Sequence, residues 1–160
     1  MWQQVKSEEQ PLIDDMFKED LKVYYITGPS GIGKSLCAIQ TAKKMGYKGG
    51  DMVSYKNGFY IGVTDGEGVC IYDDWRPSHM EASEFINFID YHIHPMNIKG
   101  GSVKNKYKLI IITSIIRPED IYRNVPAESK VQWMRRMEVI DMWPKGSDKN
   151  NDDPLVWVDD

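Results

Sequence analysis

The stretch that decides the fold is "VYYITGPSGIGKSLCA", residues 23–38, in which an apolar run breaks into a glycine-rich loop that ends in a lysine and a serine. It contains the G-x-x-x-x-G-K-[ST] pattern of a P-loop, between a predicted strand and a predicted helix. The glycines allow backbone N–H groups to curl around an anion, and the positive end of the helix adds to the attraction. We therefore predict a phosphate-binding loop made of Gly28, Pro29, Ser30, Gly31, Ile32, Gly33, Lys34 and Ser35.

The last two residues of the loop indicate the kind of phosphate ligand. Lys34 can reach the β and γ phosphates of a nucleoside triphosphate, and the Ser35 hydroxyl can bind Mg²⁺. The alternative is a glycine turn that only begins a helix, but a chance match to the whole pattern in a chain of this length is on the order of 1%. ATP and Mg²⁺ are the expected ligands.

A pair of carboxylates follows the short apolar strand "GVCIY", residues 68–72. Asp73 and Asp74 would repel each other unless a cation shared their site. We expect Asp73 to hold Mg²⁺, directly or through water, and Asp74 to orient or deprotonate an attacking water. The alternative is an acidic turn at the end of a strand.

Predicted strands alternate with predicted helices along the chain, which is typical of an α/β fold with a mainly parallel central sheet flanked by helices. In such sheets ligands collect at the carboxyl ends of the strands. Strands are expected at residues 22–27, near 52–62 with a turn at Asn57-Gly58, at 68–72 and at 108–114. Helices are expected at 34–45, at about 80–93 and through "SKVQWMRRM", residues 129–137.

Two boundaries and three regions follow from local signals. Ser78 and Glu81 have the spacing of a capping box for the second helix, and Gly46 is placed to end the first. We expect a lead-in helix or linker over residues 1–20, a single P-loop domain over 21–145, and an acidic, mobile tail over 146–160.

The composition excludes several classes of protein. No apolar run approaches the roughly 20 residues that span a bilayer, and the first residues lack the pattern of a secretory signal. An intracellular protein is expected. Cys37 falls in a predicted helix and Cys70 in a predicted strand, so we expect reduced, buried thiols and no disulfide framework.

A basic segment stands out against the net charge of −4. That charge argues against nucleic-acid binding through the overall field, so such binding must depend on a local segment. In "NIKGGSVKNKYK", residues 97–108, a hairpin would present Lys99, Lys104 and Lys106, with Lys108, to a phosphate backbone. The alternative is an ordinary solvated hairpin.

In order and spacing, these segments resemble the superfamily 3 helicase domain of replication initiator (Rep) proteins from small circular single-stranded DNA viruses, the circovirus-like group, over residues 23–143. The motifs are "GPSGIGKS" as Walker A, "VCIYDDW" as Walker B, "KGGSV" with Gly100 and Gly101 as the core of the DNA-contacting loop, "IIITSIIRPEDIY" as motif C and "WMRRM" as the arginine-finger segment.

This resemblance implies an AAA+-like fold and a homo-oligomeric, hexameric ring with ATP held between subunits. It further implies ATP-driven movement along single-stranded DNA in rolling-circle replication, and the host cell nucleus for a virus of eukaryotes. Rep proteins join this motor to an N-terminal endonuclease, which is absent here, so we expect a fragment of a longer protein. His92-Ile93-His94 mimics the His-apolar-His motif of that nuclease, but it follows Walker B and we assign it to structure.

The resemblance also implies roles for two further groups of residues. Motif C normally follows "ITS" with an asparagine that senses the γ-phosphate, but Ile115 stands there and its side chain cannot hydrogen-bond. Either Thr113 or Ser114 takes this role, or hydrolysis is slow. Arg135 or Arg136 would be the arginine finger that acts in a neighbouring subunit's site; the alternative is a pair of surface arginines.

Three rival functions are open at this point. A superfamily 3 NTPase or RNA helicase of an RNA virus would share the Walker motifs. A small P-loop kinase would need an acceptor pocket and a lid with arginines, which the sequence does not indicate. A nucleotide-dependent assembly module would bind ATP with little turnover, in line with the isoleucine in the sensor position.

Overall fold

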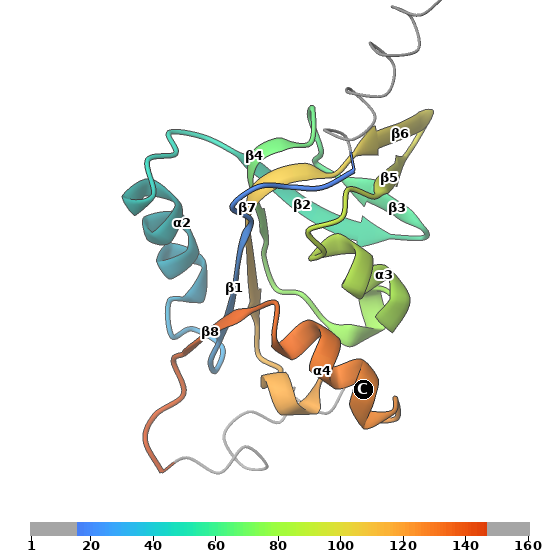
Figure 1. Cartoon of the computed structure of the whole chain (residues 1–160). Helices are drawn as coiled ribbons and strands as arrows, with labels where there is room; N and C mark the ends of the chain where they lie inside the picture. The colour runs from blue at the N-terminus through green and yellow to red at the C-terminus, as the bar shows by residue number, and fades with distance from the viewer. Residues whose placement is uncertain (1–15, 147–160) are drawn as a thin grey trace, which may run out of the picture.

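The protein was analysed as a computed structural model, which describes residues 16–146 (Figure 1). Its centre is a six-stranded sheet in the order β3-β2-β4-β7-β1-β8. Neighbouring strands are parallel except for β2 and β3, which are antiparallel. The sheet strands are β1 Lys22–Thr27, β2 Asp51–Lys56, β3 Phe59–Ile61, β4 Glu67–Tyr72, β7 Lys106–Ser114 and β8 Glu138–Asp141.

The remaining elements flank this sheet. A separate antiparallel hairpin is formed by β5 and β6, and two short 3₁₀ turns precede α3 and α4. These elements are α2 Lys34–Lys44, η1 Pro77–His79, α3 Ala82–Phe88, β5 Pro95–Ile98, β6 Gly101–Lys104, η2 Pro118–Asp120 and α4 Ala127–Met134.

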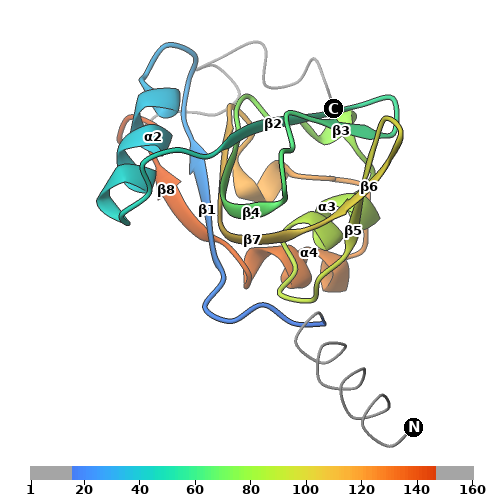
Figure 2. The same ribbon diagram turned by 90° about the horizontal axis from the view of Figure 1, so that it is seen from above.

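Both faces of the central strands are buried. Along β7, Leu109 and Ile111 pack with Ala38 of α2, whereas Ile110 and Ile112 belong to the core on the α3 and α4 side. Successive side chains of a strand point to opposite faces, so a strand covered on both sides must be apolar throughout. Figure 2 shows α2 on one side of the sheet and α3 and α4 on the other. The predicted α/β fold with a mainly parallel sheet is confirmed.

Two local predictions are confirmed by the backbone. Helix α2 ends at Lys44, and Gly46 then adopts the left-handed conformation with φ of 92°, which favours glycine at a helix end. The chain reverses between β2 and β3 through Asn57 and Gly58, with φ of 53° and 85°. Positive φ at both central residues is the geometry of a tight hairpin turn.

The helix predicted at residues 80–93 is much shorter than expected, because α3 spans Ala82–Phe88 alone. The predicted capping box is wrong: Glu81 is the N-cap and makes no side-chain capping bond, and Ser78 lies in the preceding 3₁₀ turn. After Phe88 the chain extends instead, since the Ile93 N–H donates to the carbonyl of Met16 at 2.9 Å and β5 begins at Pro95.

The end of the domain also differs from the prediction. Helix α4 ends at Met134, before the end of "WMRRM", and the chain then forms β8, which was not predicted. β8 pairs in parallel with β1, Tyr24 lying opposite Glu138 and Thr27 opposite Asp141. This pairing places the end of the domain beside the loop that follows β1.

The predictions for residues 1–15 and 147–160 lie outside the described residues. Residues 16–20, the described part of the predicted lead-in, are not helical, and Phe17 forms an isolated bridge with His92. In the part of the chain that the structure describes, every helix is too short or too polar to cross a membrane.

Both cysteines are free thiols on opposite faces of the sheet. Cys70 is fully buried, and burial raises the pKa of its thiol. Cys37 is only half-buried, so the expectation of a buried thiol holds for Cys70 alone.

Candidate nucleotide site

The predicted phosphate loop joins the carboxyl end of β1 to the start of α2, as the motif requires (Figure 1). Gly31 and Gly33 have φ of 80° and 100°, a region that side chains strongly disfavour. Gly33 caps α2, and its carbonyl accepts the first helical bond from the Cys37 N–H at 3.0 Å. A side chain at Gly28 would instead collide with its surroundings, since a Cβ there would lie 2.9 Å from Ile32 Cγ2.

Lys34 is held across the mouth of this loop. Its ammonium donates to the carbonyls of Gly28 at 2.9 Å and Pro29 at 2.8 Å. These bonds keep the cation beside the N-terminus of α2, whose unpaired N–H groups also attract anions. The loop therefore offers an ammonium group and backbone N–H groups to an anion, although the chain as a whole is negative.

The predicted magnesium ligands, Ser35 and Asp73, are in direct contact. Ser35 Oγ donates to Asp73 Oδ1 at 2.8 Å, and Thr113 Oγ1 donates to the same oxygen at 2.7 Å. The three side chains come from α2, the end of β4 and β7. Sequence-distant residues thus meet at the carboxyl edge of the parallel sheet, where ligands are expected.

The donor set at this point fits Mg²⁺. A hydroxyl and a carboxylate are the hard oxygen ligands that this ion prefers, and it normally keeps several waters and substrate phosphates as its other ligands. Among residues 16–146, no group of three or more His, Cys, Asp and Glu side chains is arranged to hold a metal ion. Ser35 and Asp73 would therefore hold Mg²⁺ together with a bound nucleotide.

Asp74 is placed differently from Asp73. It has a positive φ of 56°, its backbone N–H donates to Thr113 Oγ1 at 2.8 Å, and its carboxylate lies 3.4 Å from Arg76 Nε. The Asp74 side chain is 68% exposed. The Asp73 carboxylate is thus hydrogen-bonded to two hydroxyls, whereas the Asp74 carboxylate is exposed to solvent.

The two residues proposed to replace the sensor asparagine are placed differently. Thr113 contacts Asp73, but Ser114 is fully buried, donates to the Trp75 carbonyl at 2.6 Å and accepts from the Ile116 N–H at 3.0 Å. Ile115 is 2% exposed and belongs to the core on the α3 and α4 side. Of the two hydroxyls, the structure brings only that of Thr113 to Asp73.

The two candidate arginines also differ. Arg136 Nε lies 3.3 Å from Asp90 Oδ1, and the Arg136 side chain is 18% exposed. Burial alone would raise the pKa of Asp90, but a 3.2 Å contact with His94 and the charge of Arg136 outweigh it and hold that pKa below its ordinary value. Arg135, at the end of α4, is exposed.

The His-apolar-His segment takes part in this same structural cluster. His94 contacts Asp90, and the rings of His92 and His94 lie 5.0 Å apart. His92 also packs edge-on against Phe17 at 5.2 Å between ring centroids. The segment ties the chain before β1 to the end of α3, far from Ser35 and Asp73 in the fold.

The lysine segment forms the β5–β6 hairpin, which turns at Lys99 and Gly100. Gly100 has φ of 90°, and Gly101 begins β6 opposite Ile98. Lys99 and Lys104 are exposed. Lys106 is half-buried and Lys108 exposed, both in β7. The hairpin lies at the end of the sheet opposite the phosphate loop (Figure 1).

Several residues beside the loop were not singled out from the sequence. Thr27 Oγ1 accepts from Trp143 Nε1 at 2.9 Å and donates to the Ile116 carbonyl at 3.2 Å. The guanidinium of Arg117 lies 4.0 Å from the centroid of the Trp143 ring. No local pattern marks these contacts, because they depend on the pairing of β8 with β1.

Comparison with known proteins agrees with this geometry. The sequence model of the RNA helicase family matches residues 24–116, more than half of the chain. The chain belongs to this family. The matched region begins in β1 and ends directly after β7, so it contains the phosphate loop, Asp73 and Thr113.

Two viral proteins show the same relationship. The Replication-associated protein of Canary circovirus is 34% identical over 104 residues, which are 63% of this chain and 32% of that protein. The Replication-associated protein of Beak and feather disease virus is 34% identical over 110 residues, 67% of this chain and 34% of that protein. The chain is a Rep-like superfamily 3 helicase domain, and it spans about a third of the length of these relatives.

Proposed function

We propose that the chain is an ATPase motor that moves along single-stranded DNA in the replication of a circular viral genome. The observation that carries the proposal is the convergence of Ser35 and Thr113 on one oxygen of Asp73, beside the P-loop. Hydroxyl, carboxylate and ammonium groups assembled at a helix N-terminus are the parts that phosphoryl transfer from ATP needs. Magnesium bound there would neutralise charge on the phosphates.

Each side chain of the site would have a separate task. Lys34 would leave its two loop carbonyls to bind the β and γ phosphates, and Ser35 with Asp73 would hold the metal. Asp74, exposed at the edge, would orient a water and accept its proton. Thr113 fits the sensor role better than Ser114, whose hydroxyl is occupied by backbone groups.

An arginine from another subunit would complete the site. Arg136 is held within its own chain by Asp90, so the exposed Arg135 is the better candidate for a finger that reaches a neighbour's γ-phosphate. A ring of such subunits, hexameric in the motor class that the motifs resemble, would place ATP between adjacent copies.

The hairpin supplies the candidate DNA surface. Lys99, Gly100 and Gly101 form its tip, Lys104 ends its second strand β6, and Lys106 follows at the start of β7. Ammonium groups in this arrangement bind a phosphate backbone without reading sequence. The matched family is described as RNA helicase, whereas the two relatives are replication proteins of circoviruses, so RNA is the rival substrate.

One observation favours a second function. Ile115 is buried in the core and cannot sense a phosphate, which would suit an assembly module that binds ATP with little turnover. Such a module would oligomerise with nucleotide and release no phosphate. The two functions therefore differ in one measurable quantity.

The test is steady-state phosphate release from ATP with Mg²⁺, alone, with single-stranded DNA and with single-stranded RNA. The parent chain is compared with Lys34→Ala and with Lys56→Ala, which removes an exposed lysine of β2. We expect stimulation by DNA in the parent and in Lys56→Ala, and a loss of about 10²–10³-fold in Lys34→Ala, since Lys34 stabilises charge on the phosphates.

Three other results would each contradict the proposal. Tight ATP binding without release under any condition would favour the assembly module. Stimulation by RNA and not by DNA would favour the RNA-virus enzyme. Equal release by the parent and Lys34→Ala would place hydrolysis outside the P-loop.

A further inference from the structure

Helix α2 and the loop before it carry an apolar stripe that the other described residues, 16–146, leave exposed. Ile32, Leu36 and Ile39 follow each other at a spacing of four and three residues and are 42%, 59% and 39% exposed. Leu36 and Ile39 lie on one side of the helix, while Ala38 and Ala42 face the sheet, and Ile32 lies in the loop just before the helix. The stripe begins inside the phosphate loop, so anything bound to it lies next to the nucleotide.

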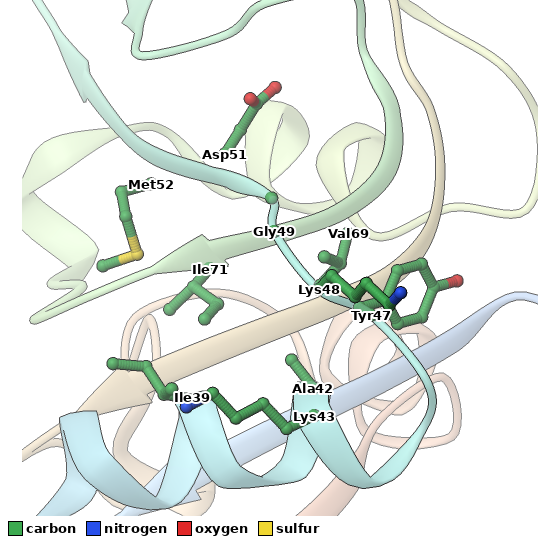
Figure 3. A pocket seen from close by; sticks show the side chains of 11 residues that line it. Ile39, Ala42, Lys43, Tyr47, Lys48, Gly49, Asp51, Met52, Val69 and Ile71 are labelled. Atoms are coloured by element: carbon green, nitrogen blue, oxygen red, sulfur yellow. The ribbon is translucent and has the colours of Figure 1, made fainter.

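The stripe ends at a hollow between α2 and the sheet. This hollow has a volume of about 150 Å³, enough for one aliphatic side chain. Figure 3 shows Ile39 and Ala42 of α2 pointing toward Val69 and Ile71 of β4, with Met52 at the rim. Lys43, Lys48 and Asp51 also line it, so cationic and acidic groups both border its apolar floor.

In the described part of the chain, a second exposed apolar surface lies on α4. Val131 and Met134 are 57% and 38% exposed, and Glu128 and Arg135 lie three residues before and four residues after Val131. These three positions share one side of the helix. Their opposite side is anchored by the fully buried Trp133. The surface therefore combines an apolar centre with one acidic and one basic end.

We propose that the outer side of α4 in one copy docks on the α2 stripe of the next copy. This inference rests on the proposed function, because it supplies the contact that brings Arg135 to a neighbour's phosphate loop. The helices would lie antiparallel, with Arg135 at the loop, Val131 over Leu36 and Ile39, and Glu128 toward Lys43.

The dimensions and charges of the two helices fit this register. From Leu36 to Lys43 the helical part of the stripe is about 10 Å long, and from Glu128 to Arg135 the α4 surface has the same length, at 1.5 Å per residue. The two surfaces are therefore equal in length. Glu128 would meet the cationic edge at Lys43, and antiparallel helix dipoles attract each other.

The two surfaces are different, and they lie on helices that cover opposite faces of the sheet (Figure 2). A contact between unlike surfaces is heterologous, so every added copy exposes a fresh surface of each kind. Rings follow when the rotation closes. Pairing of α2 with α2 would instead stop at a two-fold dimer.

The test is sedimentation velocity of the whole chain with a non-hydrolysable ATP analogue and Mg²⁺. Leu36→Asp destroys one surface and Val131→Asp the other, both at exposed positions where a charge leaves the fold intact. We expect an assembled parent, monomers for each variant alone and two-chain species in their equimolar mixture, because one intact pair of surfaces remains. Ile61→Asp, an exposed apolar change on the edge strand β3, should assemble like the parent.

Several results would contradict the proposed contact between α4 and α2. The parent could stay monomeric at several hundred micromolar, or the mixture of variants could stay monomeric. Leu36→Asp could assemble alone. Val131→Asp could form dimers alone, which would indicate α2 pairing with α2. Unchanged melting temperatures verify that each variant is folded. Phosphate release by the same samples tests the two proposals separately. A monomeric parent that releases phosphate would contradict the docking surface and support the ATPase function. Mixed dimers that release no phosphate would support the docking surface and contradict the ATPase function.

Discussion

Thr113 illustrates how one side chain serves both the fold and the site. Its hydroxyl donates to Asp73 at 2.7 Å and accepts the Asp74 backbone N–H at 2.8 Å, so it fixes the reversal of the chain after β4 as well as the orientation of the carboxylate. The next two side chains turn into the interior. Motif C normally has an asparagine two residues after this threonine, and in this chain that position, Ile115, lies in the core.

Ile115→Asn tests this placement. Restoring the asparagine that motif C normally carries would bury an amide in an apolar core, and we expect the free energy of unfolding to fall by about 2–4 kcal/mol. The rate of phosphate release should not rise. Urea unfolding is the measurement, and Ile115→Val, expected to lose about 0.5–1.5 kcal/mol, is the matched control. Unchanged stability with faster release would mean that residue 115 reaches the nucleotide.

Lys18 is a half-buried cation outside the site. Its ammonium donates to Asn105 Oδ1 at 2.8 Å, while Asn105 Nδ2 donates to the Phe88 carbonyl at 2.9 Å. Burial lowers the pKa of Lys18 from 10.5 to about 8. Between these values the unfolded chain binds more protons than the folded one, so this lysine's contribution to stability rises with pH across that window.

The prediction concerns the difference between the parent and Lys18→Met in the free energy of unfolding. From pH 8 to pH 9.5 the parent should gain about 1.5 kcal/mol relative to the variant, as its folded form loses the buried charge first. Using the difference cancels the opposite trend of Cys70, whose raised pKa lowers stability in alkali in both proteins. Urea unfolding at four pH values measures it, and a constant difference would show that the ammonium is well solvated.

At the scale of elements, the sequence predicts the helices and strands whose own residues carry a local signal. The P-loop unit and the apolar run of β7 carry their own signals in glycine spacing and in continuous hydrophobicity. β8 does not, because "EVID" is short, half charged and defined by its pairing with β1. α3 ends early for a similar reason: tertiary contacts of the following residues with Met16 and Phe17 outweigh helical spacing.

The β5–β6 hairpin has a prediction of its own. Replacing Lys99 and Lys104 by alanine should reduce the slope of log affinity for single-stranded DNA against log salt by about 1.4, since each phosphate contact contributes about 0.7. Fluorescence anisotropy over a salt series measures the slope. Lys56→Ala, an exposed lysine on β2, should leave it unchanged. Equal slopes for parent and double variant would remove the hairpin from the DNA path.

At the scale of the whole molecule, the site exists because strand order brings distant residues together. β4 and β7 are neighbours, and β7 also pairs with β1, so the ends that carry Asp73, Thr113 and the phosphate loop share one edge of the sheet. The motifs predict Ser35 and Asp73 as partners. They do not tell whether Thr113 or Ser114 is the sensor, because that depends on which face of β7 each side chain occupies. Nor do they tell whether Arg135 or Arg136 is the finger, because that depends on the ion pair of Arg136 with Asp90.

We propose that ATP turnover at this loop is completed by Arg135 of a neighbouring copy. The most direct measurement mixes Lys34→Ala with Arg135→Ala and follows phosphate release. Each variant alone should be nearly inactive. In a random mixed ring an intact loop meets an intact arginine at about a quarter of the sites, so the equimolar mixture should regain about 25% of the parental rate. Inactivity of rings verified to contain both variants would contradict the claim, as would a fully active Arg135→Ala.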